Sequence, residues 1–331
     1  MPRPPRILLP HSVVLLTSRV QQGLPFVCTP LMKTILWSTL AHAQTLYPIK
    51  IISFVVMGNH IHIIALVEDP TTVESFMERF KCESSHAINR LLDRRQVTVW
   101  AEGYDSPTIL TVDDLIEKLA YVYANPVRAH ITDSISNYQG VSSWQMYTTG
   151  QHTKEVKRIR RTLLEPLPNE PLSHAQHRRL AETVEAEATE TICFTLSPDA
   201  WTHAFPGTCT PESLNQKLLT RLQEIEREMA HLRQATRIRL PSPHDTTKAP
   251  IDTTYTPKSF GRRMWCICRD IPLRIAFINF IKELKTQAHE IRERWRQGEI
   301  SAPFPPGLFP PSQPILANLF PRMFLSTLSL A

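Results

Sequence analysis

The sequence contains few cysteines and no long apolar segment. Its six cysteines are scattered over 331 residues, too few for the disulfide framework of a small secreted domain. No segment supplies the roughly 18 uninterrupted apolar residues that a membrane-spanning helix needs. The apolar residues after the first arginines are interrupted by Pro10 and His11 before any signal-peptide cleavage pattern appears. These absences predict a soluble protein of a reducing compartment, with no membrane partner and a cytoplasmic location.

Two common signatures of enzyme sites are also missing. The chain has no glycine-rich phosphate loop, and His174 with His177 lacks the His-Glu-x-x-His arrangement of zinc proteases. Cys266 and Cys268 form one close pair of soft ligands, but no second Cys or His pair lies near them in the sequence. We interpret them as a reduced pair, with metal binding as the alternative.

Basic residues outnumber acidic residues, and the excess is unevenly distributed. The chain has 37 Lys and Arg against 31 Asp and Glu, and residues 1–150 hold 12 of each sign. The whole net charge of +6 therefore belongs to residues 151–331. A hydrophobic content of 42% indicates a globular chain, long enough for two domains with separate cores. The positive charge permits an anionic partner.

Two histidines stand one residue apart in the run Met57-Gly58-Asn59-His60-Ile61-His62-Ile63-Ile64. Side chains alternate between the two faces of a strand, so His60 and His62 share one face. Neutral imidazole is the commonest metal-ligating side chain, and a pair at i, i+2 can hold one side of a metal site. Taken alone, the pair fits a strand with two satisfied histidines at least as well. The Gly-Asn turn before it predicts a tight hairpin.

The first 150 residues alternate between strand-like and helix-like patterns. β-Branched runs predict strands, apolar residues at helical spacing predict helices, and Thr111 before two acidic residues predicts a helix start. The expected order is β-α-β-β-α-β followed by a further helix, which matches an α+β, ferredoxin-like antiparallel sheet with helices packed on one face. The expected ranges are strands at 12–20, 50–56, 61–67 and 97–100, and helices at 30–46, 71–93 and from 111 until Pro126 limits the last one.

A second informative run, Tyr121-Val122-Tyr123-Ala124-Asn125-Pro126-Val127-Arg128-Ala129, ends that last helix. If the helix reaches Asn125, then Tyr121 and Asn125 lie on the same face at i, i+4. A phenol can attack phosphorus or carbon and form a covalent intermediate, and an amide oxygen can join two imidazoles around a cation. A lone helical tyrosine is more often a core residue.

Residues 151–331 predict a mostly helical, proline-interrupted extension of unknown role. Residues 165–173 read as an extended linker and residues 241–258 as a loop. The helix expected at 211–239 carries a short a/d stripe, which favours packing against its own domain, with a dimerising coiled coil as the alternative. A further helix is expected at 271–297 with Gly298 as its stop, followed by a proline-rich tail from Phe304 that we expect to lie extended on a surface.

The two runs together resemble the HUH single-tyrosine transposases, the REP-associated tyrosine transposases and their insertion-sequence relatives. The resemblance covers about residues 8–147 and predicts that residues 1–150 form the catalytic domain. It implies that Tyr121 is the nucleophile, that His60 and His62 bind Mg²⁺ or Mn²⁺, and that Asn125 is a third ligand. It also implies cleavage and rejoining of single-stranded DNA with hairpin structure, in a bacterial nucleoid, through a 5′-phosphotyrosine. Family members often work as dimers, which leaves a homodimer with the tyrosine acting in cis or in trans as an alternative.

The chain departs from the family pattern at two positions that hold none of these ligands. Gly58 stands where the family usually has proline, and His130 where it commonly has glycine, so His130 would need the left-handed conformation. A protein that keeps DNA binding and has lost cleavage is the alternative function. The residues expected to contact DNA are Arg19, Lys81, Arg128, Lys157, Arg158, Arg160 and Arg161.

Overall fold

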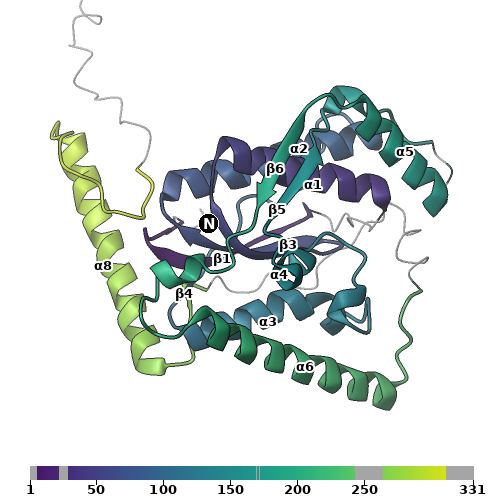
Figure 1. Ribbon diagram of the computed structural model, residues 1–331. Coiled ribbons are helices and arrows are strands. Elements are labelled where there is room, and N and C mark those ends of the chain that lie inside the picture. The colour runs from purple at the N-terminus through teal and green to yellow at the C-terminus, as the bar shows by residue number, and fades with distance from the viewer. Residues whose placement is uncertain (1–5, 22–28, 169, 171, 243–263, 311–331) are drawn as a thin grey trace, which may run out of the picture.

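The computed structural model describes residues 6–21, 29–168, 170, 172–242 and 264–310. It shows an α+β protein in which a mostly antiparallel sheet is flanked by helices (Figure 1). The order of elements up to residue 128 is the predicted one. These elements are β1 (Ser12–Arg19), α1 (Pro30–Leu46), β2 (Lys50–Val56), β3 (His60–Val67), α2 (Pro70–Leu91), β4 (Thr108–Ile109) and α3 (Val112–Arg128).

The three helices of this part begin where the sequence supplies a capping side chain. Thr29 accepts a hydrogen bond from the backbone of Met32 at the start of α1, and Asp69 accepts two at the start of α2. Thr111 does the same for the backbone N–H of Asp114 in α3. A side-chain oxygen at this position satisfies a backbone donor that has no partner inside the helix, which fixes the first turn.

The main sheet has the strand order β2-β3-β1-β4-β7, where β7 is Cys266–Ile267. β3 pairs antiparallel with β2 and β1, and β1 pairs antiparallel with β4. The four strands of the β-α-β-β-α-β unit thus form the expected ferredoxin-like sheet. β7 adds a parallel strand at the β4 edge, so the C-terminal extension contributes to the sheet.

Alternating side chains of the central strands pack into two separate hydrophobic cores, one on each face of the sheet. Leu16 and Ile63 pack in the core that α1 and α2 cover, whereas Leu15 and Ile64 pack in the core of α3. The two helices inside the β-α-β-β-α-β unit therefore cover one face, as predicted. The further helix α3 covers the other face, which is the face to which His60 and His62 belong.

The prediction of a strand at 97–100 is wrong, because the fourth strand of the unit, β4, lies at Thr108–Ile109. Trp100 makes only an isolated bridge with Val20. Its indole Nε1 donates to Ser84 Oγ at 2.8 Å and its ring lies against Phe80, both on α2. The aromatic side chain is therefore used to fasten a loop to a helix, a long-range contact that β-propensity does not reveal.

The extension contains more regular structure than the sequence predicts. The second sheet, β5 (Thr153–Lys157) with β6 (Thr191–Thr195), was not expected because β5 carries four charged or polar exposed residues and little apolar surface. Helix α5 was not expected either. The remaining elements are η2 (Ile135–Asn137), α4 (Trp144–Thr149), η3 (Arg161–Leu163), α5 (His174–Glu187), η4 (Ala200–His203), α6 (Pro211–Thr236) and α8 (Ile271–Arg296).

Helix α6 runs along α3 (Figure 1). Leu218, Leu222 and Ile225 of its a/d stripe are buried in the core that α3 shares, whereas Leu232 near its end is 44% exposed. Most of the stripe therefore packs against the same chain, which confirms the prediction that α6 packs against its own domain. Arg221 of α6 also pairs with Glu117 of α3 at 3.5 Å.

Helix α8 ends near the predicted stop, with Gly298 at a left-handed φ of 101°. The described part of the tail packs as predicted on a surface, because Leu308 bridges Ile7 and both join the cluster of α8. The loop predicted at 241–258 lies almost wholly outside the described residues. Within the described part of the chain, no helix has the length and apolar character needed to cross a membrane.

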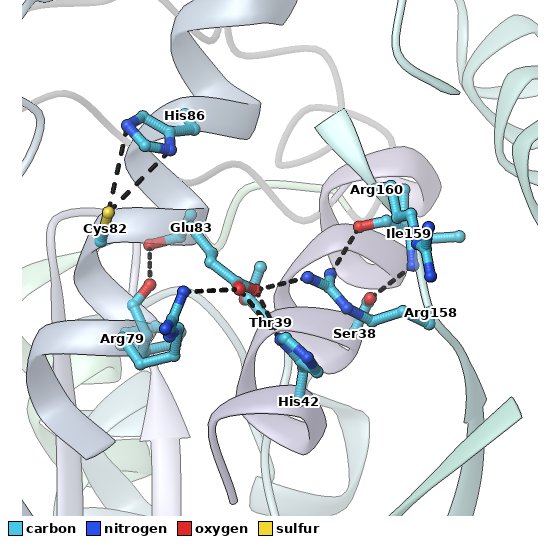
Figure 2. A network of polar contacts seen from close by, with 12 residues as sticks. Ser38, Thr39, His42, Arg79, Cys82, Glu83, His86, Arg158, Ile159 and Arg160 are labelled. Carbon is cyan, nitrogen blue, oxygen red and sulfur yellow. Dashed lines mark hydrogen bonds and ion pairs between the residues drawn. The ribbon is translucent and has the colours of Figure 1, made fainter. Parts of the chain in front are cut away.

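A network of polar contacts around Glu83 ties the extension to α1 and α2 (Figure 2). The Glu83 carboxylate accepts from Arg158 Nη2 at 2.9 Å and contacts His42 Nδ1 at 2.9 Å. Ser38 of α1 accepts a hydrogen bond from the backbone N–H of Ile159 at 2.7 Å. The side chains of Glu83 and Arg158 are only 14% and 11% exposed, so their attraction is poorly screened by water.

Glu83→Gln should lower the free energy of unfolding by about 2 kcal/mol, because it removes the charge that satisfies a largely buried arginine. Urea unfolding followed by circular dichroism measures this loss. Glu165→Gln is the matched control, since Glu165 also pairs with an arginine at 2.9 Å but is 79% exposed. Its loss should stay below about 1 kcal/mol. Equal losses in the two variants would contradict the role of the network.

Candidate active site

The hairpin between β2 and β3 places the two histidines. Met57 N–H donates to the His60 carbonyl at 2.7 Å and closes the turn. In the register with β1, His60 stands opposite Arg19 and His62 opposite Thr17. The rings of His60 and His62 lie 4.6 Å apart between centroids, so the shared face predicted from their spacing is confirmed.

Hydrogen bonds orient both imidazoles. His60 Nδ1 lies 2.7 Å from Asn59 Oδ1, and His62 Nδ1 lies 2.8 Å from Thr17 Oγ1. An amide oxygen can only accept, so His60 carries its proton on Nδ1 and keeps a lone pair on Nε2. His62 Nε2 is buried and has no hydrogen-bond partner within the described residues. In metal-binding histidines, a hydrogen bond to the ring nitrogen that does not bind the metal usually fixes the orientation of the ring.

Both histidines are held in the neutral form. Burial and, to a smaller extent, the nearby Arg19 guanidinium together lower the pKa of His60 to about 4. Burial also holds the pKa of His62 well below its usual range, with smaller contributions from His60, Arg19 and Lys118. Neutral imidazole is the form that binds metal ions.

Helix α3 brings the tyrosine to the histidines. The ring of Tyr121 lies 5.4 Å from the ring of His62 between centroids. The helix continues past Pro126 to Arg128, so Asn125 is helical and stands one turn beyond Tyr121 on the same face. Asn125 is 8% exposed. Residues from two runs sixty positions apart therefore meet on one face of the sheet.

Two comparisons find known proteins that are similar to part of this chain. Residues 26–125 match the family model described as "Transposase IS200 like". This match covers 100 of the 331 residues, so this part of the chain is similar to IS200-like transposases. One similar solved structure is a REP-associated tyrosine transposase bound to a REP hairpin, with 16% identity and a TM-score of 0.37, over 45% of this chain and 86% of that one. Comparison with curated proteins finds no match.

The family match ends at Asn125, and His130 lies just beyond it. His130 has a φ of 54°, which is the left-handed conformation expected where the family commonly has glycine. Its backbone N–H donates to the carbonyl of Val127 at 3.1 Å as α3 ends. His130 therefore adopts the backbone conformation that glycine would adopt at this position. Its side chain makes that left-handed conformation sterically less favourable than it is for glycine.

Three cationic side chains surround the tyrosine site. The Arg128 guanidinium and the Lys118 ammonium lie 5.9 and 5.3 Å from the centroid of the Tyr121 ring. Arg19 lies opposite His60. Lys118 was missed by the sequence analysis, although its position three residues before Tyr121 places it on the same helical face. Burial and the nearby Arg269 lower the pKa of Lys118.

The other residues expected to contact DNA lie away from Tyr121. Lys81 Nζ donates to the carbonyls of Ala101 and Gly103 at 2.8 and 2.7 Å, which holds the loop after Trp100. Arg158 pairs with Glu83, as described above, on the side of α1 and α2. The remaining three are Lys157, Arg160 and Arg161. Lys157 is the last residue of β5 and contacts Thr191, whereas Arg160 and Arg161 follow β5. Arg160 pairs with Glu190, and Arg161 begins η3.

The donor set fits a divalent cation by its chemistry. No group of three or more His, Cys, Asp or Glu side chains in the described part of the chain is arranged to hold a metal ion. The predicted set instead combines two imidazoles with one amide oxygen. The buried Nε2 of His62, which has no hydrogen-bond partner among the described residues, is the kind of unsatisfied ring nitrogen that a bound cation would satisfy.

Proposed function

We propose that this protein cleaves and rejoins single-stranded DNA, with Tyr121 as the nucleophile. The observation that carries the proposal is the 5.4 Å separation between the rings of Tyr121 and His62. A side chain able to form a covalent phosphoester stands next to a pair of neutral imidazoles. Both belong to one chain, which favours a tyrosine that acts in cis.

In the proposed reaction, Tyr121 Oη forms a bond to phosphorus while the bond from phosphorus to the 3′-oxygen breaks. The phenol loses its proton, the 3′-oxygen gains one, and the 5′ strand stays attached as a phosphotyrosine. Attack by another 3′-hydroxyl reverses the step and joins strands, because the phosphodiester bond energy is kept in the protein–DNA linkage. The positive charges of Lys118 and Arg128 attract the DNA backbone toward the tyrosine.

His60, His62 and Asn125 are the residues that would hold Mg²⁺ or Mn²⁺. Bound there, the cation supplies a Lewis acid for the phosphoryl oxygens. Thr17 and Asn59 are positioning residues, since each fixes one imidazole through its Nδ1 atom. Arg19 helps to keep both imidazoles neutral.

The proposal is tested with labelled single-stranded DNA hairpins, incubated with the full-length protein and Mg²⁺ or Mn²⁺. A covalent adduct on a denaturing gel, mapped to Tyr121 by mass spectrometry, is the expected result. An adduct mapped to a different residue would contradict the role of Tyr121. DNA binding without any adduct would favour the alternative of a binding protein that has lost cleavage.

Thr17→Val should raise the metal concentration needed for half-maximal adduct formation by about 10-fold. The substitution keeps the shape of the side chain and removes the hydroxyl that lies 2.8 Å from His62 Nδ1. Adduct yield measured over a Mn²⁺ titration gives this value, and saturating Mn²⁺ should restore much of the yield. Thr39→Val is the control, because its hydroxyl bonds only the Leu36 carbonyl within α1. A Thr17→Val curve that overlays the Thr39→Val curve would exclude Thr17 as a positioning residue.

A further inference from the structure

A pocket of about 270 Å³ opens beside Tyr121, between α3 and the C-terminal extension. Its volume lies just under the range of about 300–1,000 Å³ that is common for small-molecule sites. One wall comes from α3, and the other comes from α6 and the residues at β7. The side chains that matter are Lys118, Tyr121 and Arg128 on the first wall and Arg221, Cys268 and Arg269 on the second.

Backbone pairing and a buried helix hold the second wall in place. β7 pairs in parallel with β4, with Cys266 opposite Thr108 and Ile267 opposite Ile109. The backbone N–H of Arg269 then donates to the buried carboxylate of Asp114 at 3.1 Å. On the other side, the apolar stripe of α6 fixes Arg221 above α3. The extension is thus attached at two points around the tyrosine helix.

The residues that line the pocket include two more positively charged side chains than negatively charged ones. Its four cations are Lys118, Arg128, Arg221 and Arg269, and its two acids are Asp114 and Glu117. Glu117 Oε2 is neutralised by Arg269 Nη2 at 2.9 Å and by Arg221 at 3.5 Å. No carboxylate of the described residues forms an ion pair with Lys118 or Arg128. An anion in this pocket would therefore meet two cations, Lys118 and Arg128, that have no direct ion-pair partner among the described residues.

Arg269 is the cation of the second wall that a ligand can reach. Its side chain is 68% exposed, whereas that of Arg221 is 29% exposed and divided among three glutamates. A guanidinium group has five N–H donors in a planar fork. The ion pair with Glu117 uses only part of that capacity, and a phosphate matches the remaining donors.

We propose that α6 and the residues at the end of β7 complete a phosphate-binding pocket beside Tyr121, in which Arg269 contacts a backbone phosphate next to the scissile one. The ligand is a phosphodiester of single-stranded DNA, an identity that rests on the proposed function. The pocket gives the extension a role in strand binding. It also compensates for the balanced charge of the first 150 residues, because it brings cations from the basic half of the chain to the tyrosine.

The test measures DNA binding without cleavage. Full-length protein carrying Tyr121→Phe is titrated onto fluorescein-labelled single-stranded DNA, and the anisotropy is followed at several salt concentrations. Arg269→Ala should weaken binding about 10-fold and reduce the slope of log K against log salt by about 0.7, the value for one phosphate contact on a single strand. Arg269→Lys keeps the charge and should largely preserve the slope.

Two control variants separate a DNA contact from a structural effect. Arg296→Ala removes an arginine of the same 68% exposure that also pairs with one glutamate, on α8, and should change neither affinity nor slope. Glu117→Gln breaks the ion pair of Arg269 but leaves the arginine present, so binding should stay equal or become tighter. Weaker binding by Glu117→Gln, or identical behaviour of Arg269→Ala and Arg296→Ala, would overturn the proposal.

Failure of this pocket and failure of the proposed function give different results. Normal DNA binding that depends on Arg269, with no adduct from the protein that retains Tyr121, would contradict only the cleavage reaction. A normal adduct together with salt dependence that is unchanged in Arg269→Ala would contradict only the pocket. Absence of binding to single-stranded DNA by the unmodified protein would overturn both.

Discussion

Tyr121→Phe should abolish the covalent protein–DNA adduct, with a loss of at least about 1,000-fold in the rate of its formation. The substitution removes one oxygen atom, the atom that forms the new bond to phosphorus. No other tyrosine among the described residues has its ring next to the histidine pair. Denaturing gels of reactions with labelled hairpin DNA, sampled over hours, measure the loss.

The Phe variant should fold normally. The Tyr121 ring keeps its edge contact with His62 and its place beneath Lys118 and Arg128. The phenol oxygen donates no hydrogen bond within the described residues, so its removal leaves no buried group unsatisfied. Thermal unfolding of the variant should match that of the unmodified protein, within about 0.5 kcal/mol.

Tyr123→Phe makes the same deletion two residues further along α3 and serves as the matched control. Tyr123 is buried on another face of the helix, where its hydroxyl lies 3.2 Å from Ser143 Oγ. Burial raises the pKa of this phenol, which suits a neutral core residue. The variant should lose about 1 kcal/mol of stability and keep its adduct. The hypothesis would not survive an adduct that persists in Tyr121→Phe and disappears in Tyr123→Phe.

The position of the site could be predicted because local patterns determine each of its parts. Strand alternation places His60 and His62 on one face, and helical spacing places Tyr121 with Asn125 one turn apart. The capping residue Thr111 fixes where α3 begins. The apolar residues of α3 then determine which side of the helix faces the sheet. The same helical spacing would have identified Lys118, had charge been considered along with chemistry.

The wall that the extension adds could not be predicted by such rules. β7 has only two residues, and it pairs with residues that lie 158 positions earlier in the chain. A strand this short has no periodicity to detect, and its position depends on long-range packing. The basic residues near 158 show a related limit, since a count of charges does not reveal that Arg158 is largely buried against Glu83.

His62→Ala should reduce adduct formation by more than about 100-fold at low metal concentration. It removes the imidazole whose buried Nε2 has no partner among the described residues and whose ring contacts both His60 and Tyr121. Adduct yield is measured over a wide Mn²⁺ range, and tryptophan fluorescence in urea monitors the fold.

His177→Ala is the control for the loss of a buried histidine. His177 and His62 are each 6% exposed, and each has one buried ring nitrogen without a partner. His177 lies on α5, which packs against α1, across the sheet from the tyrosine. Both variants should lose comparable stability because both create a cavity, and only His62→Ala should change the metal dependence. Equal adduct yields from the two variants at every Mn²⁺ concentration would exclude His62 as a ligand and leave Tyr121 without the imidazole pair that distinguishes it from an ordinary helical tyrosine.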